Sequence, residues 1–425
     1  MEIHVVQPGD SLYRIAQMHG TSLPFLIAQN DLHEPFRLTP GQTIVIPQPV
    51  RTYTVRRGDT LTAIAAREGM TVLQLLQNNP QLGGQEQIRP GQPLVLSYGN
   101  KLGTFAVNGY AYPGIDVRVL RRTLPYLTYL SVFSYGFDET GRILPQQAGQ
   151  LTRLARQYGV QPLLVLTTLG EDGAFSSERA HRLLHDLAAR RGLLDSLQQM
   201  LSAQGFAGVD VDFEYIPPED AAAYASFIRE VRARLEPEGL TVLVALAPKT
   251  SAAQQGLLYE AHDYRALGAA ADLALLMTYE WGYALSEPMA VAPIDKVAQV
   301  VRFAASVIPP EKLLLGIPNY GYDWTLPYIK GQSRARSLGN VQAVEQAVQV
   351  GAPIGFDDTA QSPYYHYWRD HAEHAVWFED ARSIRAKLML AGEYRLHGIS
   401  VWNIMRYFPQ LWLVLNTQYE IVKRG

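Results

Sequence analysis

From about Leu102 onward, short apolar runs alternate with amphipathic helical patterns, and this alternation constrains the fold more than any other feature of the chain. Repeated βα units place parallel strands side by side, with helices packed over them. The candidate strands are TFAVNGY (104–110), TYLSVFSYGF (128–137), PLLVLTT (162–168), AGVDVDFEY (207–215), TVLVALAP (241–248), DLALLMTYE (272–280), KLLLGIPNYG (312–321) and GISVWNI (398–404). Eight strands in about 320 residues predict a TIM (β/α)8 barrel, with a doubly wound open sheet as the alternative.

The interval before the last strand is too long for a single βα unit. Residues from about 324 to 378 contain YIKGQSRARSLGN, PIGFDDTAQSPYYHYWRD and HAVWFED, and we expect a small α+β insertion there. The segment is rich in Tyr and Trp. These aromatic side chains could form one wall of a groove, or they could be the insertion's own core.

The front of the chain is a duplicated unit. The segment HVVQPGDSLYRIAQMHGTSLPFLIAQND from His4 is matched by YTVRRGDTLTAIAAREGMTVLQLLQNNP from Tyr53, and each copy ends in a Pro-Gly turn before a β-rich run. Each copy predicts the order strand, helix, helix, strand, with Ser or Thr at a helix cap. We therefore expect three domains, at 1–48, 51–97 and 102–425.

Three carboxylates alternate along the fourth candidate strand. Asp210, Asp212 and Glu214 occupy every second position of GVDVDFEY, so they face the same side of a strand. In a barrel that side leads from the core to the mouth, where catalytic groups lie. Carboxylates this close cannot all ionise cheaply, so at least one should hold a proton near neutral pH, and Glu214, nearest the mouth, is the candidate general acid.

Two other interpretations of the three carboxylates remain open. They could form structural ion pairs, although no Lys or Arg accompanies them in the strand. They could also bind Mg²⁺ or Ca²⁺, although the sequence shows no obvious cluster of further ligands, and HAEH (371–374) in the insertion has only two His. We expect no metal and no cofactor.

Composition excludes several classes of partner and chemistry. The formal net charge is −3, with Lys and Arg scattered along the chain, which argues against nucleic acid or an anionic membrane surface. The chain has no cysteine, so disulfides and thiolate chemistry are excluded. MEIHVVQPGD does not have the pattern of a signal peptide, and no apolar run is long enough to span a membrane. We expect a soluble monomer made in the cytosol.

The paired GD(S/T)L signature and the PGQ turn resemble the LysM module, a small βααβ domain that binds glycans containing N-acetylglucosamine, such as peptidoglycan and chitin. A tandem of structural repeats without a ligand is the alternative. The resemblance implies glycan contacts on the loops, and its candidate residues are Gly9, Asp10, Ser11, Leu12 and Asn30 in the first copy and Gly58, Asp59, Thr60, Leu61 and Asn79 in the second.

The barrel motifs resemble the chitinase-like family 18 glycoside hydrolases. GVDVDFEY is similar to their DxDxE signature, and MTYE (277–280), GIPNYGYDW (316–324) and GISVWNIM (398–405) are similar to their later strand motifs. The resemblance implies that the substrate's own acetamido group attacks the anomeric carbon. Glu214 would then be the acid, Asp212 would orient the acetamide, Asp210 would tune Asp212, and Tyr279 would donate a hydrogen bond. The expected sugar-binding residues are Tyr135, Met277, Glu280, Trp281, Asn319, Tyr320 and Trp402, with Tyr283 as a further stacking candidate.

Three positions depart from the common chitinase pattern, namely Ala207, Phe213 and Glu280. Together with the paired front modules, they make the chain resemble the spore cortex-lytic N-acetylglucosaminidases. This resemblance implies a retaining enzyme that cleaves peptidoglycan, with cortex fragments released in germination as the substrate. It also implies synthesis in the mother cell without a signal peptide, and a place at the boundary of spore coat and cortex. A chitinase and an inactive glycan-binding protein are the alternatives.

Overall fold

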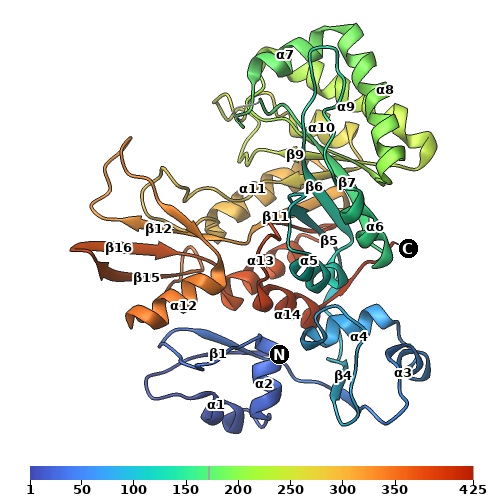
Figure 1. Cartoon of the computed structure of the whole chain (residues 1–425). Helices are drawn as coiled ribbons and strands as arrows, with labels where there is room; N and C mark the ends of the chain where they lie inside the picture. The colour runs from blue at the N-terminus through green and yellow to red at the C-terminus, as the bar shows by residue number, and fades with distance from the viewer. Residues whose placement is uncertain (171–172, 425) are drawn as a thin grey trace.

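The computed structural model describes residues 1–170 and 173–424. Within these residues, eight parallel strands close into a barrel in chain order, because the last strand pairs with the first (Figure 1). The strands are β5 (Gly103–Ala111), β6 (Tyr129–Tyr135), β7 (Gln161–Thr167), β8 (Gly208–Asp212), β9 (Thr241–Leu246), β10 (Leu273–Leu276), β11 (Leu313–Pro318) and β17 (Gly398–Trp402). Closure confirms the predicted TIM barrel and excludes the open sheet.

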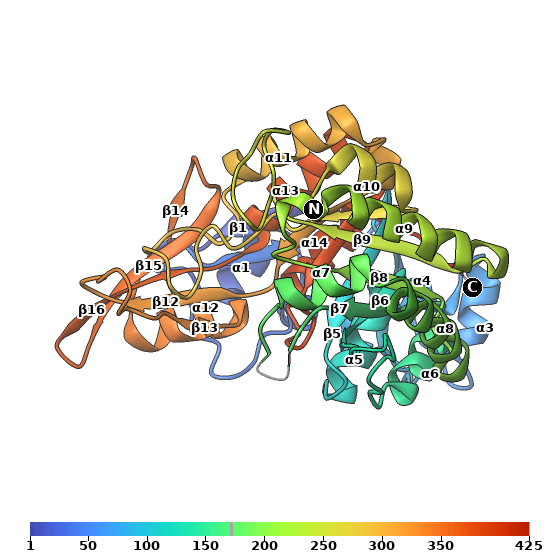
Figure 2. The same ribbon diagram turned by 90° about the horizontal axis from the view of Figure 1, so that it is seen from above.

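Helices cover the outside of the barrel (Figures 1 and 2). They are α5 (Val117–Thr123), α6 (Gly149–Gln157), α7 (Ser177–His185), α8 (Leu187–Gln204), α9 (Ala221–Leu235), α10 (Tyr264–Ala270), α11 (Ile294–Val307), α13 (Ala381–Glu393) and α14 (Pro409–Gln418). Short 3-10 turns are η1 (Pro80–Leu82), η2 (Leu124–Tyr126), η3 (Pro218–Asp220), η4 (Glu236–Glu238) and η5 (Pro310–Lys312), and a last short strand, β18 (Tyr419–Ile421), pairs with the start of β5. No helix among the described residues is long and apolar enough to cross a membrane.

The alternation of side chains along the strands separates two cores. Val209 and Val211 of β8 belong to the outer core between strands and helices, whereas Val165 of β7 and Leu243 of β9 belong to the inner core of the barrel. Because the period of a strand is two residues, Asp210 and Asp212 of β8 face the barrel interior. The sequence therefore predicts correctly which side of β8 carries the carboxylates.

An insertion between β11 and β17 forms a separate layer beside the barrel mouth (Figure 2). Its antiparallel sheet, in the order β13-β12-β16-β15-β14, packs against one helix. The elements are β12 (Gly321–Thr325), β13 (Arg336–Leu338), α12 (Asn340–Val350), β14 (Gly355–Asp357), β15 (Ser362–Arg369) and β16 (Ala372–Trp377). Tyr365, Tyr367 and Phe378 are buried in the insertion's own core, so only part of its aromatic content is available to a groove.

The two front modules have the predicted order of elements. The first contains β1 (Glu2–Val5), α1 (Leu12–Met18), α2 (Leu23–Asn30) and β2 (Thr43–Ile46), and the second contains β3 (Arg51–Thr54), α3 (Leu61–Glu68), α4 (Val72–Asn78) and β4 (Pro93–Ser97). In each module the two strands pair antiparallel. Ser11 and Thr60 cap the first helices by accepting hydrogen bonds from backbone N–H groups, as their sequence context predicts.

Both modules are packed against the barrel rather than tethered to it loosely (Figure 1). In the first, Gln410 Nε2 of α14 donates to Thr43 O at 2.7 Å. In the second, Asn416 Nδ2 donates to Asn78 Oδ1 at 2.9 Å, and the hydroxyl of Tyr158 donates to Gly84 O at 2.6 Å. These contacts, two of them buried, fix where the modules lie relative to the barrel.

Gly41 and Gly91 offer a matched test of this docking. Both are the glycine of the PGQ turn, with φ of +84° and +83°. A Cβ on Gly41 would lie 1.8 Å from Ile354 O, whereas a Cβ on Gly91 would meet nothing within 4 Å. Both alanine variants strain the left-handed turn, but only Gly41→Ala should separate the first module from the insertion.

The measurement is hydrogen exchange at the Ile354 amide, which donates to Pro40 O at 2.8 Å. We expect faster exchange in Gly41→Ala than in the wild type, and wild-type exchange in Gly91→Ala. If the Ile354 amide exchanges at the same rate in both variants, the docking of the first module does not depend on the contact between Gly41 and Ile354.

Candidate active site

The three carboxylates lie where β8 ends and its following loop begins. The strand ends at Asp212, so Glu214 lies beyond it, and the expectation of a continuous strand to 215 is wrong. His262 Nε2 donates to Phe213 O at 3.0 Å, and Ser177 Oγ donates to Tyr215 O at 2.5 Å. Tyr215 has a φ of +56°, a left-handed conformation that the sequence does not signal. These contacts from other elements hold the backbone on both sides of Glu214.

Asp210 lies deepest and belongs to a polar layer inside the barrel. Ser131 Oγ is 2.8 Å from Asp210 Oδ2 and 3.1 Å from Asn108 Oδ1, and Asn108 Nδ2 donates to Ser400 Oγ at 3.0 Å. All four side chains are buried. Among the described residues, none of the three carboxylates forms an ion pair with a basic side chain, so the structural ion-pair interpretation loses its support.

Asp212 and Glu214 line one cavity at the barrel mouth. The cavity has a volume of about 230 Å³, and it also contains Met277, Tyr279, Glu280 and Trp402, which the sequence analysis selected. The ring of Trp402 lies edge-on to those of Tyr110 and Phe133, at 5.2 Å and 5.0 Å between centroids. Residues that lie far apart in the sequence thus surround one space that is lined by three carboxyl groups.

A second cavity of about 260 Å³ shares Glu280 and Trp402 with the first and also contains Asn319 and Tyr320. The carboxylate of Glu280 accepts hydrogen bonds from the hydroxyls of Tyr320 and Tyr322, the latter at 3.1 Å. Asn319 Nδ2 donates to the carbonyls of Asn403 and Arg406, so its amide holds the loop after β17. The two cavities therefore share Trp402 and Glu280, and the other candidates are divided between them.

Burial dominates the electrostatics of the carboxylates. It raises the pKa of Asp210 to about 7, and the hydroxyls of Tyr110 and Ser131 oppose this rise. Burial raises the pKa of Asp212 well above its usual range, and the negative charges of Glu214 and Asp210 are smaller causes in the same direction. Burial, followed by the charge of Glu280, raises the pKa of Glu214 to about 7. At least one proton is therefore held among these groups near neutral pH.

Three aromatic candidates lie outside both cavities. Tyr135 is fully buried in the outer core, and its hydroxyl donates to Gln204 Oε1 at 3.1 Å. A register irregularity between Val132 and Tyr135 turns the tyrosine away from the barrel interior, so its expected role in stacking is wrong. Trp281 packs against the outer core, Tyr283 is exposed, and neither is among the residues that line the two cavities.

Most of the glycan-binding candidates in the front modules perform structural tasks. Asp10 and Asp59 accept hydrogen bonds from the backbone N–H groups of Gln7 and Arg56. Leu12 and Leu61 are core residues, and Asn30 and Asn79 are buried. Gly9 and Gly58 have positive φ and open space around them. These residues therefore shape the loops. Ser11 and Thr60 cap helices and are exposed, and glycan contact by the candidates stays a prediction.

Asn79 provides a direct test of this structural role. Its Nδ2 donates to Leu75 O and Val95 O, and its Oδ1 accepts from Val95 N, each at 2.8 Å. Asn79→Ala should leave buried backbone groups unpaired and lower the free energy of unfolding by about 1–3 kcal/mol, measured by urea unfolding. Exposed Asn100→Ala is the control. Unchanged stability together with lost glycan binding in Asn79→Ala would restore the ligand role.

The sequence analysis missed several cavity residues. Tyr110 and Phe133 come from the carboxyl ends of β5 and β6. They occupy inward-facing positions in the alternation of these strands, and that pattern could have identified them as cavity residues. Phe175, Leu258 and Tyr259 come from loops after β7 and β9. No periodic pattern marks a loop residue that folds over a cavity, so these three could not be identified from spacing.

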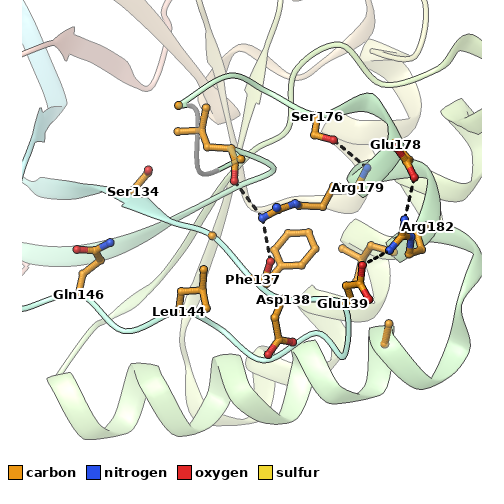
Figure 3. A pocket seen from close by; sticks show the side chains of 16 residues that line it. Ser134, Phe137, Asp138, Glu139, Leu144, Gln146, Ser176, Glu178, Arg179 and Arg182 are labelled. Carbon is orange, nitrogen blue, oxygen red and sulfur yellow. Dashed lines mark hydrogen bonds and ion pairs between the residues drawn. The ribbon is translucent and has the colours of Figure 1, made fainter.

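A further cavity of about 630 Å³ lies between the loops after β6 and β7 and contains none of the selected residues (Figure 3). Its two arginines already have partners within the protein. Arg179 donates to the carbonyls of Phe137 and Leu169, and Arg182 bonds to Glu139 and Glu178 (Figure 3). None of the catalytic candidates lines this cavity, so the smaller cavity around Glu214 is the better candidate.

Comparisons with known proteins agree with the fold and the motifs. Residues 121–406 match the model for glycosyl hydrolases family 18, and residues 4–47 and 53–97 each match the LysM domain. The cortical fragment-lytic enzyme of Bacillus subtilis is 41% identical, over 100% of this chain and 99% of its own length. The corresponding enzyme of Bacillus anthracis is 34% identical, over 100% of both chains.

A solved structure extends the likeness to three dimensions. The crystal structure of the Bacillus cereus spore cortex-lytic enzyme SleL is 34% identical, with a TM-score of 0.85, and the match covers 100% of this chain and 99% of that one. The match includes the front modules as well as the barrel, because it extends over the whole chain. The protein therefore belongs to family 18 of the glycosyl hydrolases and carries two LysM domains in front of its barrel.

Proposed function

We propose that this glycosidase hydrolyses the β-1,4 bond that follows N-acetylglucosamine in spore cortex peptidoglycan fragments, with retention of configuration. Glu214 protonates the glycosidic oxygen and later activates water. Asp212 orients the substrate's acetamide and stabilises the cation that forms when its oxygen attacks the anomeric carbon. Asp210 tunes Asp212, and Tyr279 donates a hydrogen bond to the acetamide oxygen.

The observation that carries this proposal is the convergence of Asp212, Glu214 and Tyr279 on one cavity beside Trp402. Asp212 Oδ1 is buried and has no hydrogen-bond partner among the described residues. A buried acceptor without a partner is costly, and an acetamide N–H is the kind of donor that would satisfy it. Trp402 and its aromatic neighbours provide an apolar surface on which a sugar ring can stack.

The choice of substrate rests on the relatives. Two that match essentially the whole chain are named as cortical fragment-lytic enzymes, and both LysM domains are present here. We infer that the LysM domains bind peptidoglycan and bring the fragment to the barrel. We also infer that the protein acts on the spore and is made in the mother cell.

Two alternatives make different predictions. A chitinase would release products from chitin, and an inactive glycan-binding protein would release none. The inactive form is disfavoured because Glu214 is present and its pKa is raised to about 7, so it can hold the proton that an acid must donate.

The test is digestion of purified cortex fragments and of chitin, followed by mass spectrometry of the new ends. We expect products from cortex fragments that carry N-acetylglucosamine at the new reducing end. Products from chitin alone, or new muramic acid reducing ends, would overturn the cortex assignment.

The activity should also depend on pH. Glu214 must be protonated to act as the acid, so kcat/KM should fall as the pH rises above about 7. Because Glu214 and Asp212 interact, the apparent pKa belongs to the pair. The measurement is the initial rate on cortex fragments from mildly acidic to alkaline pH. A rate that still increases above pH ~8 would contradict an acid role for Glu214.

A further inference from the structure

His181, His185 and Asp220 form a cluster on the outside of the barrel, away from the cavity residues. His181 Nδ1 lies 2.8 Å from Asp220 Oδ2, and His185 Nε2 lies 2.7 Å from Asp220 Oδ1. If each residue offers one ligand atom, the three ligand atoms all lie within 4.8 Å of one another. The two histidines are four residues apart on α7, so they occupy the same face of that helix.

Asp220 is a buried carboxylate with no Lys or Arg partner among the described residues. Its side chain is 1% exposed, and its ion-pair partners there are the two imidazoles. A positive charge beside a buried carboxylate stabilises it. A divalent cation held by the two imidazole nitrogens and the carboxylate would supply that charge.

We propose that His181 Nδ1, His185 Nε2 and Asp220 bind a divalent transition metal, zinc above all. Two imidazole nitrogens and one carboxylate oxygen are a donor set that zinc accepts, with water as the fourth ligand. The side chains of His181 and His185 are 52% and 53% exposed, so the cluster is open to solvent on one side for that water. This inference does not depend on the proposed substrate.

The spacing of the ligand atoms is compatible with a zinc site. Ligands of tetrahedral zinc with bonds of about 2.0–2.2 Å stand roughly 3.3–3.6 Å apart, which lies between the N···O distances and the 4.8 Å within which the three ligand atoms fall. Both imidazole side chains are half-exposed, so small rotations of the rings can bring the atoms to that spacing. The exposed pair His366 and Glu373 has a similar N···O distance of 3.0 Å, but no third ligand belongs to it among the described residues.

The position of the cluster suggests what the metal would stabilise. Ser177, the first residue of α7, donates to Tyr215 O, directly after Glu214. Asp220 ends η3, a few residues farther along the same loop. A metal ion that joins α7 to η3 would therefore hold the loop that carries the acid. Its expected effect is on the stability of this loop and of the protein, without a step in hydrolysis.

The experiment uses the full chain after treatment with a chelator and removal of that chelator. Calorimetry with ZnSO4 should give one site per chain, and zinc should raise the Tm. Co²⁺ in place of zinc should give the visible absorption of a low-coordinate nitrogen and oxygen site. His185→Gln should weaken binding by about tenfold or more and abolish the rise in Tm, whereas His366→Gln should keep both.

Two results would overturn the proposal. One is the absence of a one-to-one site in the wild-type chain. The other is equal zinc affinity in His185→Gln and the wild type, which would place the ion elsewhere. His185 is half-exposed, so its variant is expected to fold. Asp220→Asn with a native circular dichroism spectrum provides a second removal of a ligand, and unchanged zinc affinity in that variant would likewise count against the site.

Discussion

Glu214→Gln is expected to lower kcat/KM on cortex fragments by about 10³-fold or more, because glutamine keeps the shape of the side chain but has no acidic proton. The effect should lie in kcat. Binding of the chain to peptidoglycan should persist, because the LysM domains are separate from the cavity. The measurements are steady-state rates and co-sedimentation with cortex peptidoglycan. Exposed Glu219→Gln, on the same loop, is the matched control and should retain the wild-type rate.

The same variant separates lost chemistry from lost folding. Burial raises the pKa of Glu214 from 4.5 to about 7, so between these values the folded chain binds more protons at this group than the unfolded chain does. The stability contributed by Glu214 therefore falls as the pH rises through this window. Glutamine has no such dependence. Glu214→Gln should have a higher Tm than the wild type at pH ~8 and a similar Tm near pH ~4. A variant that is inactive and also less stable at neutral pH would leave the acid assignment without support.

Asp212→Asn is expected to lower kcat by about 10²- to 10³-fold, which is the second large effect that we predict. Asparagine can accept a hydrogen bond from the acetamide, but it cannot carry the negative charge that stabilises the cation formed by acetamide attack. The loss should therefore fall on kcat more than on KM. Exposed Asp358→Asn, in the insertion, is the control. A kcat for Asp212→Asn close to that of the wild type would mean that another group stabilises the cation.

The barrel was predictable because short segments of the sequence determine each of its strands and helices. Each strand is a short apolar run between helical patterns, and the period of two in GVDVDFEY determines which side chains face inward. The end of β8 was not predictable in the same way. Phe213 continues the apolar run, and the strand ends where His262 and Ser177, from other elements, bind the backbone on either side of Glu214.

The candidate site was predictable at strand ends and within three residues beyond them, and not farther along the loops. Asp212 and Trp402 end β8 and β17, Glu214 and Tyr279 lie two and three residues beyond β8 and β10, and all four line the cavity. Tyr135 obeyed the same alternation but faces outward, because a register irregularity in β6 is invisible in the residue pattern. The buried Asn79 shows a related limit, since a residue that belongs to a binding module's signature can be required for its fold rather than for its ligand.

The most direct test of the account is the configuration of the first product. Hydrolysis of cortex fragments should be followed by proton NMR from the first minutes, before mutarotation mixes the anomers. The account predicts that N-acetylglucosamine at the new reducing end appears first as the β anomer, because attack by the acetamide and then by water inverts the centre twice. An α anomer as the first product would contradict substrate-assisted catalysis at Asp212 and Glu214.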